Sequence, residues 1–151
     1  MRLTMHTDFA LRMLMLLAME PEELHTIEEI ARRYDISRNH LMKVTQTLVQ
    51  AGFLDSLRGR GGGLRLARPA SKIVIGDVVR ATEDGFDLVE CFDRSQNRCL
   101  ITPACGLRGP LEEALLAFLT VLDSYSLADL VARPGTLRRM RHLLVDEAEA
   151  G

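Results

Sequence analysis

The sequence lacks the features of an exported or membrane-bound protein. No N-terminal stretch combines a basic region, an apolar region and a small-residue cleavage site, as secretory signals do. The apolar stretch from Ala10 to Met19 is far shorter than the roughly 20 residues that span a bilayer. We therefore expect a cytoplasmic protein with no membrane partner, in a compartment that keeps thiols reduced.

Cysteine is scarce, and its few copies lie close together. The three cysteines, Cys91, Cys99 and Cys105, fall within fifteen residues and have the spacing C-x7-C-x5-C. A secreted disulfide framework would need an even number, so the trio predicts thiolate ligands gathered around a metal centre, with a fourth ligand to be identified. Structural zinc sites usually contain C-x2-4-C pairs, which this sequence lacks, and zinc is therefore the weaker candidate.

The sequence also lacks the patterns of an enzyme or of a nucleotide-binding loop. The glycine-rich run from Arg58 to Gly63 has no Lys-Ser/Thr pair after it and opens no helix, unlike a P-loop. No pairing of a cysteine with a histidine indicates a catalytic thiol. We therefore expect a protein that is not an enzyme.

What the sequence does contain is a basic block inside an otherwise acidic chain. Its 151 residues, 47% of them hydrophobic, can bury one core with an appended helix. The net charge is −2, yet residues 32–80 carry ten Lys and Arg against three acidic residues, a local net charge of +7. Such a block predicts a binding site for a polyanion.

The apolar periodicity of this block predicts a helix-turn-helix. A first helix is expected over residues 7–19, and Thr26 with Glu29 forms the pattern of a capping box that opens a short second helix. After a tight turn at residues 34–36, Ser37 would cap a third helix that ends near Gly52. In a helix-turn-helix the last of these helices enters the major groove with its first residues. The predicted DNA contacts on it are Ser37, Arg38, Asn39, His40 and Lys43.

A β-hairpin is predicted directly after the helix-turn-helix. Residues 53–57 and 64–67 read as short strands, and the glycine-rich run between them permits a hairpin loop. A hairpin at this place is a wing, whose basic tip can reach the phosphate backbone or the minor groove. The wing residues predicted to contact DNA are Arg58, Arg60, Gly61, Gly62 and Arg65.

The second half of the chain is expected to be helical around the cysteines. A short helix is predicted at residues 75–81, and a longer one follows Pro110 with a broad apolar face. One small domain has too little chain to cover this face, which predicts pairing with a second copy, although packing against the same chain stays open. Ser126 is expected to cap a last short helix over residues 127–131.

These predictions define the fold class and its boundaries. We predict a mainly α fold with a small β-hairpin wing, that is, a winged helix-turn-helix domain plus a long C-terminal dimerisation helix. The winged helix-turn-helix is assigned to residues 1–80 and the cysteine segment to 81–109. The dimerisation helix and the short terminal helix occupy 110–131. Residues 132–151 form a tail that we expect to fray.

Five motifs carry a resemblance to a known family. They are MRLTMHTDFALRML, ISRNHLMKV, LRGRGGGLRLARPASKIVIGDVVRATE, LVECFDRSQNRCLITPACGLRG and DSYSLADLV, in this order over residues 1–131. Together they resemble the winged-helix iron–sulfur regulators, and most closely the nitric-oxide-sensing branch of that family. The resemblance implies a homodimer that binds palindromic double-stranded operator DNA. It also implies one iron–sulfur cluster per subunit, [4Fe–4S] in preference to [2Fe–2S], held by the three cysteines near the dimer interface.

The resemblance also bears on the fourth cluster ligand. The cluster-assembly branch of the family uses a histidine three residues after the last cysteine, and this chain has Arg108 there, which cannot bind iron. In the nitric-oxide-sensing branch an aspartate of the first helix reaches the cluster of the partner subunit, and Asp8 stands at that place. The residues alone favour another role for Asp8, that of an acidic residue that stabilises a helix N-terminus, and only the resemblance favours ligation. His6, Glu90 and Asp93 remain as substitutes.

The function implied is that of a nitric-oxide-responsive transcriptional repressor. It would lose affinity for operator DNA when its cluster reacts with nitric oxide. Two alternatives stay open. Residues 83–92 also resemble the iron-responsive branch of the family, and the cysteines of a cluster-free regulator would serve as a thiol redox switch.

Overall fold

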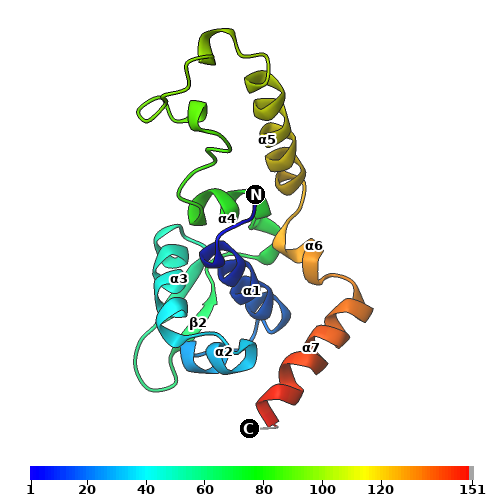
Figure 1. The fold of residues 1–151 in the computed structure, drawn as a ribbon. Helices are drawn as coiled ribbons and strands as arrows, with labels where there is room; N and C mark the ends of the chain where they lie inside the picture. Colours follow the sequence, from blue (N-terminus) through cyan, green and yellow to red (C-terminus); the bar gives the residue numbers. More distant parts are fainter. Residues whose placement is uncertain (150–151) are drawn as a thin grey trace.

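The fold is described by a computed structural model that covers residues 1–149, with side chains described for residues 1–144. Its helices and strands follow the chain in one order (Figure 1). They are α1 (Met5–Met19), α2 (Ile27–Tyr34), α3 (Arg38–Gln50), β1 (Leu54–Leu57), β2 (Gly63–Leu66), η1 (Ala70–Lys72), α4 (Ile75–Thr82), η2 (Glu90–Phe92), η3 (Thr102–Ala104), α5 (Arg108–Asp123), α6 (Leu127–Val131) and α7 (Pro134–Glu149).

Helix α1 forms the centre of the hydrophobic core. Its first turn is capped by Thr4, whose hydroxyl accepts a hydrogen bond from the Thr7 N–H at 3.3 Å. The helix packs against α3, α4 and α6, and seven of its apolar residues are at most 7% exposed. These buried residues are Phe9, Ala10, Met13, Leu14, Leu16, Leu17 and Met19. Because α1 is apolar on most of its circumference, helices can pack on several of its sides.

The predicted helix-turn-helix is confirmed as α2 and α3, with differences in capping. Thr26 caps α2 by accepting from the Glu29 N–H at 3.2 Å. The Glu29 carboxylate instead accepts from Arg33 at 2.6 Å, so the side-chain half of the predicted capping box is replaced by an ion pair. Ser37 occupies the N-cap of α3 but makes no capping hydrogen bond with its side chain. Gly52, with a φ of 77°, follows the end of α3 as predicted.

The predicted hairpin is confirmed as an antiparallel pair of strands. Leu54 lies opposite Leu66, and Leu57 lies opposite Gly63. The positive φ of Gly61, 76°, is a conformation that glycine adopts without steric cost. A third segment extends the hairpin, because His25 and Leu64 exchange two backbone hydrogen bonds of 3.2 and 2.8 Å. The base of the wing is thereby joined to the chain just before α2.

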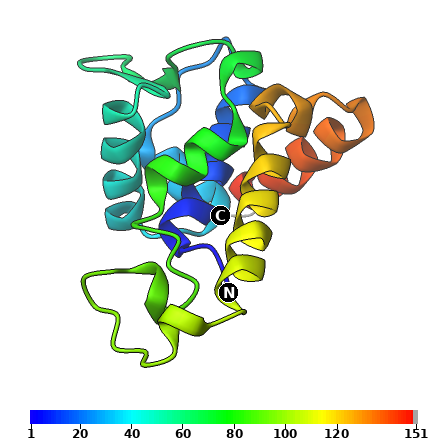
Figure 2. The ribbon, with the colours of Figure 1, turned by 90° about the horizontal axis from the view of Figure 1, so that it is seen from above.

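Helix α5 projects from this body (Figure 1). It is joined to α4 by Arg80, which donates to both carboxylate oxygens of Asp123 at 2.6 and 2.8 Å. The two helices approach closely because Gly76 has no side chain: a Cβ there would lie 1.8 Å from the Asp123 carboxylate. Figure 2 shows the cysteine segment at the edge of the molecule, with the N-terminus beside α5.

The C-terminal region differs from its prediction. We expected residues 132–151 to fray, whereas helix α7 covers Pro134–Glu149. Residues 150 and 151 of that tail lie outside the described residues. Leu137, Met140 and Leu144 recur at three- and four-residue steps and pack against the core, which explains the helix. Arg141 also donates to the backbone carbonyl of Met19 at 2.5 Å. No helix within the described residues is long and apolar enough to cross a bilayer.

Candidate DNA interface and cysteine segment

The side chains predicted to contact bases lie on the exposed face of α3. Ser37, Arg38, Asn39, His40 and Lys43 are all exposed, whereas the opposite face of the helix is buried in the core. This division follows from the helical period, which separates the polar positions from the apolar ones. A recognition helix must present its polar face in this way to enter a groove.

Neighbouring elements hold two of these side chains in place. The Arg38 Nε donates to Glu28 at 2.6 Å, and this hydrogen bond lowers the pKa of the Glu28 carboxyl. The His40 ring lies edge-on to the Phe9 ring, with 5.5 Å between centroids. Two turns further along α3, the Thr47 hydroxyl lies 3.1 Å from the His6 Nε2. The N-terminal half of α1 therefore contacts the recognition helix at two points.

The wing presents its basic residues as predicted. Arg58, Arg60 and Arg65 are exposed, and among the side chains of residues 1–144 only Arg65 of the three has an ion-pair partner, Asp55 at 3.5 Å. A Cβ on Gly62 would lie 2.2 Å from the Leu57 carbonyl oxygen, so the tip requires glycine at this position.

Sequence reasoning did not single out Arg68, which lies just beyond β2. Its guanidinium stacks over the Phe53 ring at 4.9 Å, at the base of the hairpin. Arg68 is exposed and widens the basic surface beside the wing. Arg68 belongs to the basic block of residues 32–80. Its charge was therefore the signal in the sequence that could have assigned Arg68 to the predicted DNA-binding surface.

The three cysteines lie outside the hydrophobic core, between α4 and α5. Cys99 is exposed, Cys91 and Cys105 are half-buried, and all three are free thiols. The segment that carries them is irregular chain with two single turns, η2 and η3.

Local hydrogen bonds shape the loop around Cys99. The Asn97 side chain accepts from the Cys99 N–H at 3.0 Å and donates to the Thr102 hydroxyl at 3.1 Å. The Thr102 hydroxyl in turn donates to the Cys99 carbonyl at 2.9 Å. These bonds fix the backbone at Cys99 and leave its sulfur exposed.

The substitute ligands in this segment are engaged in hydrogen bonds. Glu90 accepts from the Arg98 N–H, and Asp93 accepts from the N–H and the hydroxyl of Ser95 at 2.8 and 2.6 Å. The hydrogen bonds from Ser95 lower the pKa of the Asp93 carboxyl. Both carboxylates therefore stabilise turns of the cysteine segment itself.

Asp8 lies in the first turn of α1 and is partly exposed, at 46% of its side chain. Arg12 donates to both of its oxygens, at 2.6 and 3.1 Å, and so holds the carboxylate on the helix surface. The position of Asp8 relative to a partner subunit stays a prediction.

Glu83 connects the start of the cysteine segment to α1. Its carboxylate accepts from the N–H and the hydroxyl of Thr4 at 2.8 and 3.0 Å. Partial burial would raise the pKa of Glu83, but hydrogen bonds from Thr7 and Thr4 outweigh it, and the pKa lies below 4.5. The segment that carries the cysteines is thus tied to the helix that carries Asp8.

The arrangement of winged helix, cysteine segment and projecting helix matches a known family. Residues 3–133 match Rrf2, described as an iron-dependent transcriptional regulator. The chain belongs to the Rrf2 family. It is 56% identical over 132 residues to the transcriptional regulator NsrR of Bacillus subtilis, covering 87% of this chain and 90% of the relative. The predicted family resemblance is therefore confirmed.

Solved structures agree with the Rrf2 assignment. A transcriptional regulator from Listeria innocua superposes with a TM-score of 0.74 at 26% identity, covering 89% of this chain and 88% of the other. IscR of T. potens superposes with a TM-score of 0.70 at 25% identity, covering 87% of each chain. The Rrf2 chain described here is a winged-helix transcriptional regulator, and its partner is DNA.

Proposed function

We propose that this chain is a nitric-oxide-responsive repressor that binds operator DNA as a homodimer and carries one iron–sulfur cluster per subunit. The observation that carries the proposal is the cysteine segment, in which three free thiols sit outside the core between the DNA-binding unit and α5. The similarity to NsrR supports the same assignment.

The donor set fits an iron–sulfur cluster. Thiolates are the ligands that such clusters prefer, and a group of three leaves one position to be completed. Cys91, Cys99 and Cys105 would hold the cluster, with [4Fe–4S] favoured over [2Fe–2S]. Asp8 of the partner subunit would supply the fourth bond, since Glu90 and Asp93 already accept hydrogen bonds within the segment.

When bound, the cluster would supply iron that reacts with nitric oxide. Asp8 would be the ligand released most readily, because a carboxylate is a hard ligand among soft thiolates. Once released, Asp8 can keep its two hydrogen bonds with Arg12 and stay on α1. Arg12 would therefore pair with the charge of Asp8 both when Asp8 binds the cluster and after its release.

A route from Asp8 to DNA runs through the first turns of α1. Phe9 contacts His40, and His6 contacts Thr47, so a shift of this part of α1 would move the recognition helix. In a dimer, two recognition helices must lie about one DNA turn apart to engage both half-sites. A small rotation of the subunits would therefore lower operator affinity.

Helix α5 supports the homodimer. None of its residues is buried within the chain, and its exposed side chains include Leu116 and Val121, at 66% and 58% exposure. Apolar surface of this kind is typical of an interface between subunits. We therefore assign α5 as the dimerisation helix.

Anaerobic purification tests the proposal. We expect a coloured protein whose visible absorbance and operator binding both fall as nitric oxide is added. Asp8→Ala should alter the cluster spectrum and the response to nitric oxide, whereas Asp84→Ala, an exposed acidic residue in the cysteine segment, should alter neither. A colourless protein, or an Asp8→Ala variant with unchanged spectrum and response, would contradict the proposal.

Iron sensing is the second candidate, favoured by the family's description as iron-dependent. It predicts that an iron chelator releases the protein from DNA, whereas nitric oxide does not. Gel shifts with either reagent distinguish the two sensors. A protein without a cluster whose DNA binding responds to thiol oxidation would instead be a redox switch.

A further inference from the structure

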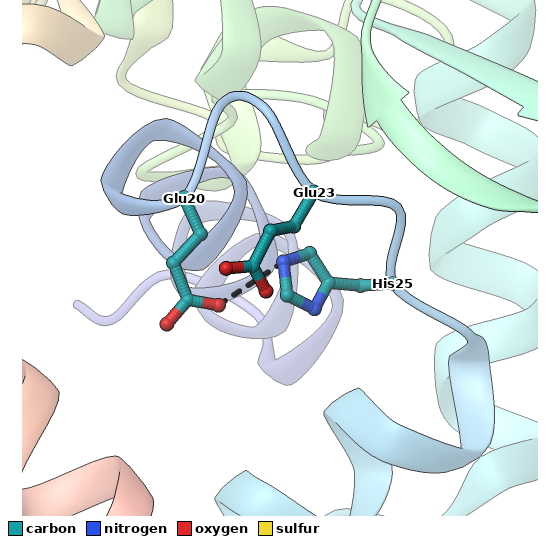
Figure 3. Close-up of side chains that lie close together, drawn as sticks. All are labelled: Glu20, Glu23 and His25. Carbon is teal, nitrogen blue, oxygen red and sulfur yellow. Dashed lines mark ion pairs between the residues drawn. The ribbon is translucent and has the colours of Figure 1, made fainter.

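Three side chains with metal-binding chemistry meet between the end of α1 and the start of α2 (Figure 3). They are Glu20, Glu23 and His25, and one potential ligand atom of each lies within 4.8 Å of the other two. Glu20 is the C-cap of α1, and His25 directly precedes the N-cap of α2. The group belongs to the winged helix and includes no cysteine.

The histidine of this group is buried without a hydrogen bond on one nitrogen. His25 is 0% exposed, and its Nε2 has no hydrogen-bond partner among the side chains that the structure describes. The Glu20 Oε2 lies 3.1 Å from this nitrogen, which is an ion-pair contact only when the ring is protonated. Figure 3 shows the carboxylates of Glu20 and Glu23 beside this nitrogen. A buried polar atom left unpaired is costly, and a bound group at this position would remove that cost.

Neighbouring side chains hold His25 and Glu20 in the way that second partners hold metal ligands. The His25 Nδ1 lies 3.1 Å from the Glu29 Oε1, and a proton on Nδ1 would leave the Nε2 lone pair facing two carboxylates. A carboxylate on the far nitrogen is the usual second partner of a metal-binding histidine. Arg33 donates to Glu20 at 3.0 Å and to Glu29 at 2.6 Å, fixing both carboxylates.

We propose that Glu20, Glu23 and His25 bind one divalent cation of the Zn²⁺ class. Zinc accepts imidazole nitrogen and carboxylate oxygen together, at about 2.0–2.2 Å. Ligand atoms that lie within 4.8 Å of one another need only a small inward movement to reach these distances from a zinc ion. Glu23 is exposed, so its side chain can change rotamer to make that movement. Water would complete the coordination on the exposed side.

The cation would link three elements of the winged helix. His25 exchanges two backbone hydrogen bonds with Leu64 of β2, and Glu20 ends α1. A metal ion joining these residues would connect α1, the start of α2 and the wing. Because the ion would bind the folded chain in preference to the unfolded one, it would raise the melting temperature.

The test uses the full-length chain with its competing thiols removed. Serine replaces the three cysteines, Cys91, Cys99 and Cys105, so that any metal uptake belongs to another site. Titration with Zn²⁺ followed by calorimetry should show one saturable site per chain and a rise in melting temperature of several degrees. Co²⁺ in place of Zn²⁺ should give visible absorption without thiolate charge-transfer bands.

Two glutamine variants make the assignment specific. Glu23→Gln should weaken Zn²⁺ binding at least about tenfold, since losing a ligand costs no less than losing one of its hydrogen-bonded partners. Glu22→Gln changes an exposed neighbour outside the group and should bind as the parent chain does. Absence of saturable Zn²⁺ binding to the cysteine-free chain would overturn the proposal and leave His25 with a structural role beside its glutamates. Equal affinity in Glu23→Gln and Glu22→Gln would overturn it too. Neither outcome depends on the cluster or on nitric oxide.

Discussion

Helix α1 and helix α5 are of similar length, yet they bury very different amounts of surface. Buried apolar side chains follow α1 from Phe9 to Met19, whereas α5 buries none of its sixteen residues within the chain. The winged helix around α1 is therefore held by a hydrophobic core. The cysteine segment and α5 depend on local turns and on a few links such as Arg80–Asp123.

Under the proposed function, this difference would separate stability from sensing. A region held by core packing keeps the recognition helix and the wing in one arrangement. A region with little buried surface can rearrange at low free-energy cost, as a sensing segment must. The links between the two regions are then the places where a signal can pass.

The largest expected effect distinguishes a core position from a position on α5. Leu48→Ala should lower the free energy of unfolding by about 2–5 kcal/mol, because it opens a cavity beside α1. Leu116→Ala, on α5, should change it by less than about 0.5 kcal/mol in the monomer and instead weaken self-association. Urea denaturation and sedimentation velocity measure the two effects. Equal losses of stability would show that α5 packs within its own chain.

The second effect compares a tight turn of the wing with a loose one in the cysteine segment. Gly62→Ala would place a Cβ 2.2 Å from the Leu57 carbonyl, so the wing tip must shift and operator affinity should fall at least about tenfold. Gly106→Ala meets nothing within 4 Å and should leave DNA binding unchanged. Fluorescence anisotropy with labelled operator measures both affinities. Unchanged binding by the Gly62 variant would remove the wing from the interface.

The third effect separates two kinds of DNA contact within the winged helix. Arg60→Ala should weaken binding to all sequences and lower the salt-dependence slope by about 1, because it removes one phosphate contact. Asn39→Ala should reduce discrimination between operators by about 1–3 kcal/mol while keeping the slope. Gel shifts over a series of salt concentrations and operator variants would reveal an exchange of these roles.

The smallest effect concerns Glu83, which joins the two regions. Its pKa is lowered in the folded chain, so its stabilising contribution is present above pH 4.5 and is lost as the pH falls below that value. Glu83→Gln should therefore lower the melting temperature slightly at neutral pH and by less in acid. Melting curves from about pH 6 to about pH 3 test this. Asp84→Asn is the matched control, and a difference that grows in acid would contradict the assignment.

The winged helix could be predicted from the sequence because its signals are local. The cap at Thr26, the apolar steps from Leu41 to Leu48 and the glycines of the wing each act within a few residues. The cysteine segment was located from its spacing alone. Its geometry was not predictable, because turns such as the one at Asn97 depend on side-chain hydrogen bonds.

Long-range contacts account for what the sequence did not reveal. Helix α7 is polar along much of its length, and its order comes from packing on a core built more than a hundred residues earlier in the chain. The group around His25 likewise depends on Glu20 and Arg33, which lie on two different helices. No pattern in the sequence places these residues together.

The backbone pairing of His25 with Leu64 also limits how the protein reads DNA. It joins the base of the wing to the chain just before α2 by backbone hydrogen bonds, which restricts movement of the wing relative to the helix-turn-helix. If α3 and the wing bind DNA as predicted, their base contacts and backbone contacts would therefore move together. An operator shortened or lengthened by one base pair within a half-site should then lose contacts with either α3 or the wing.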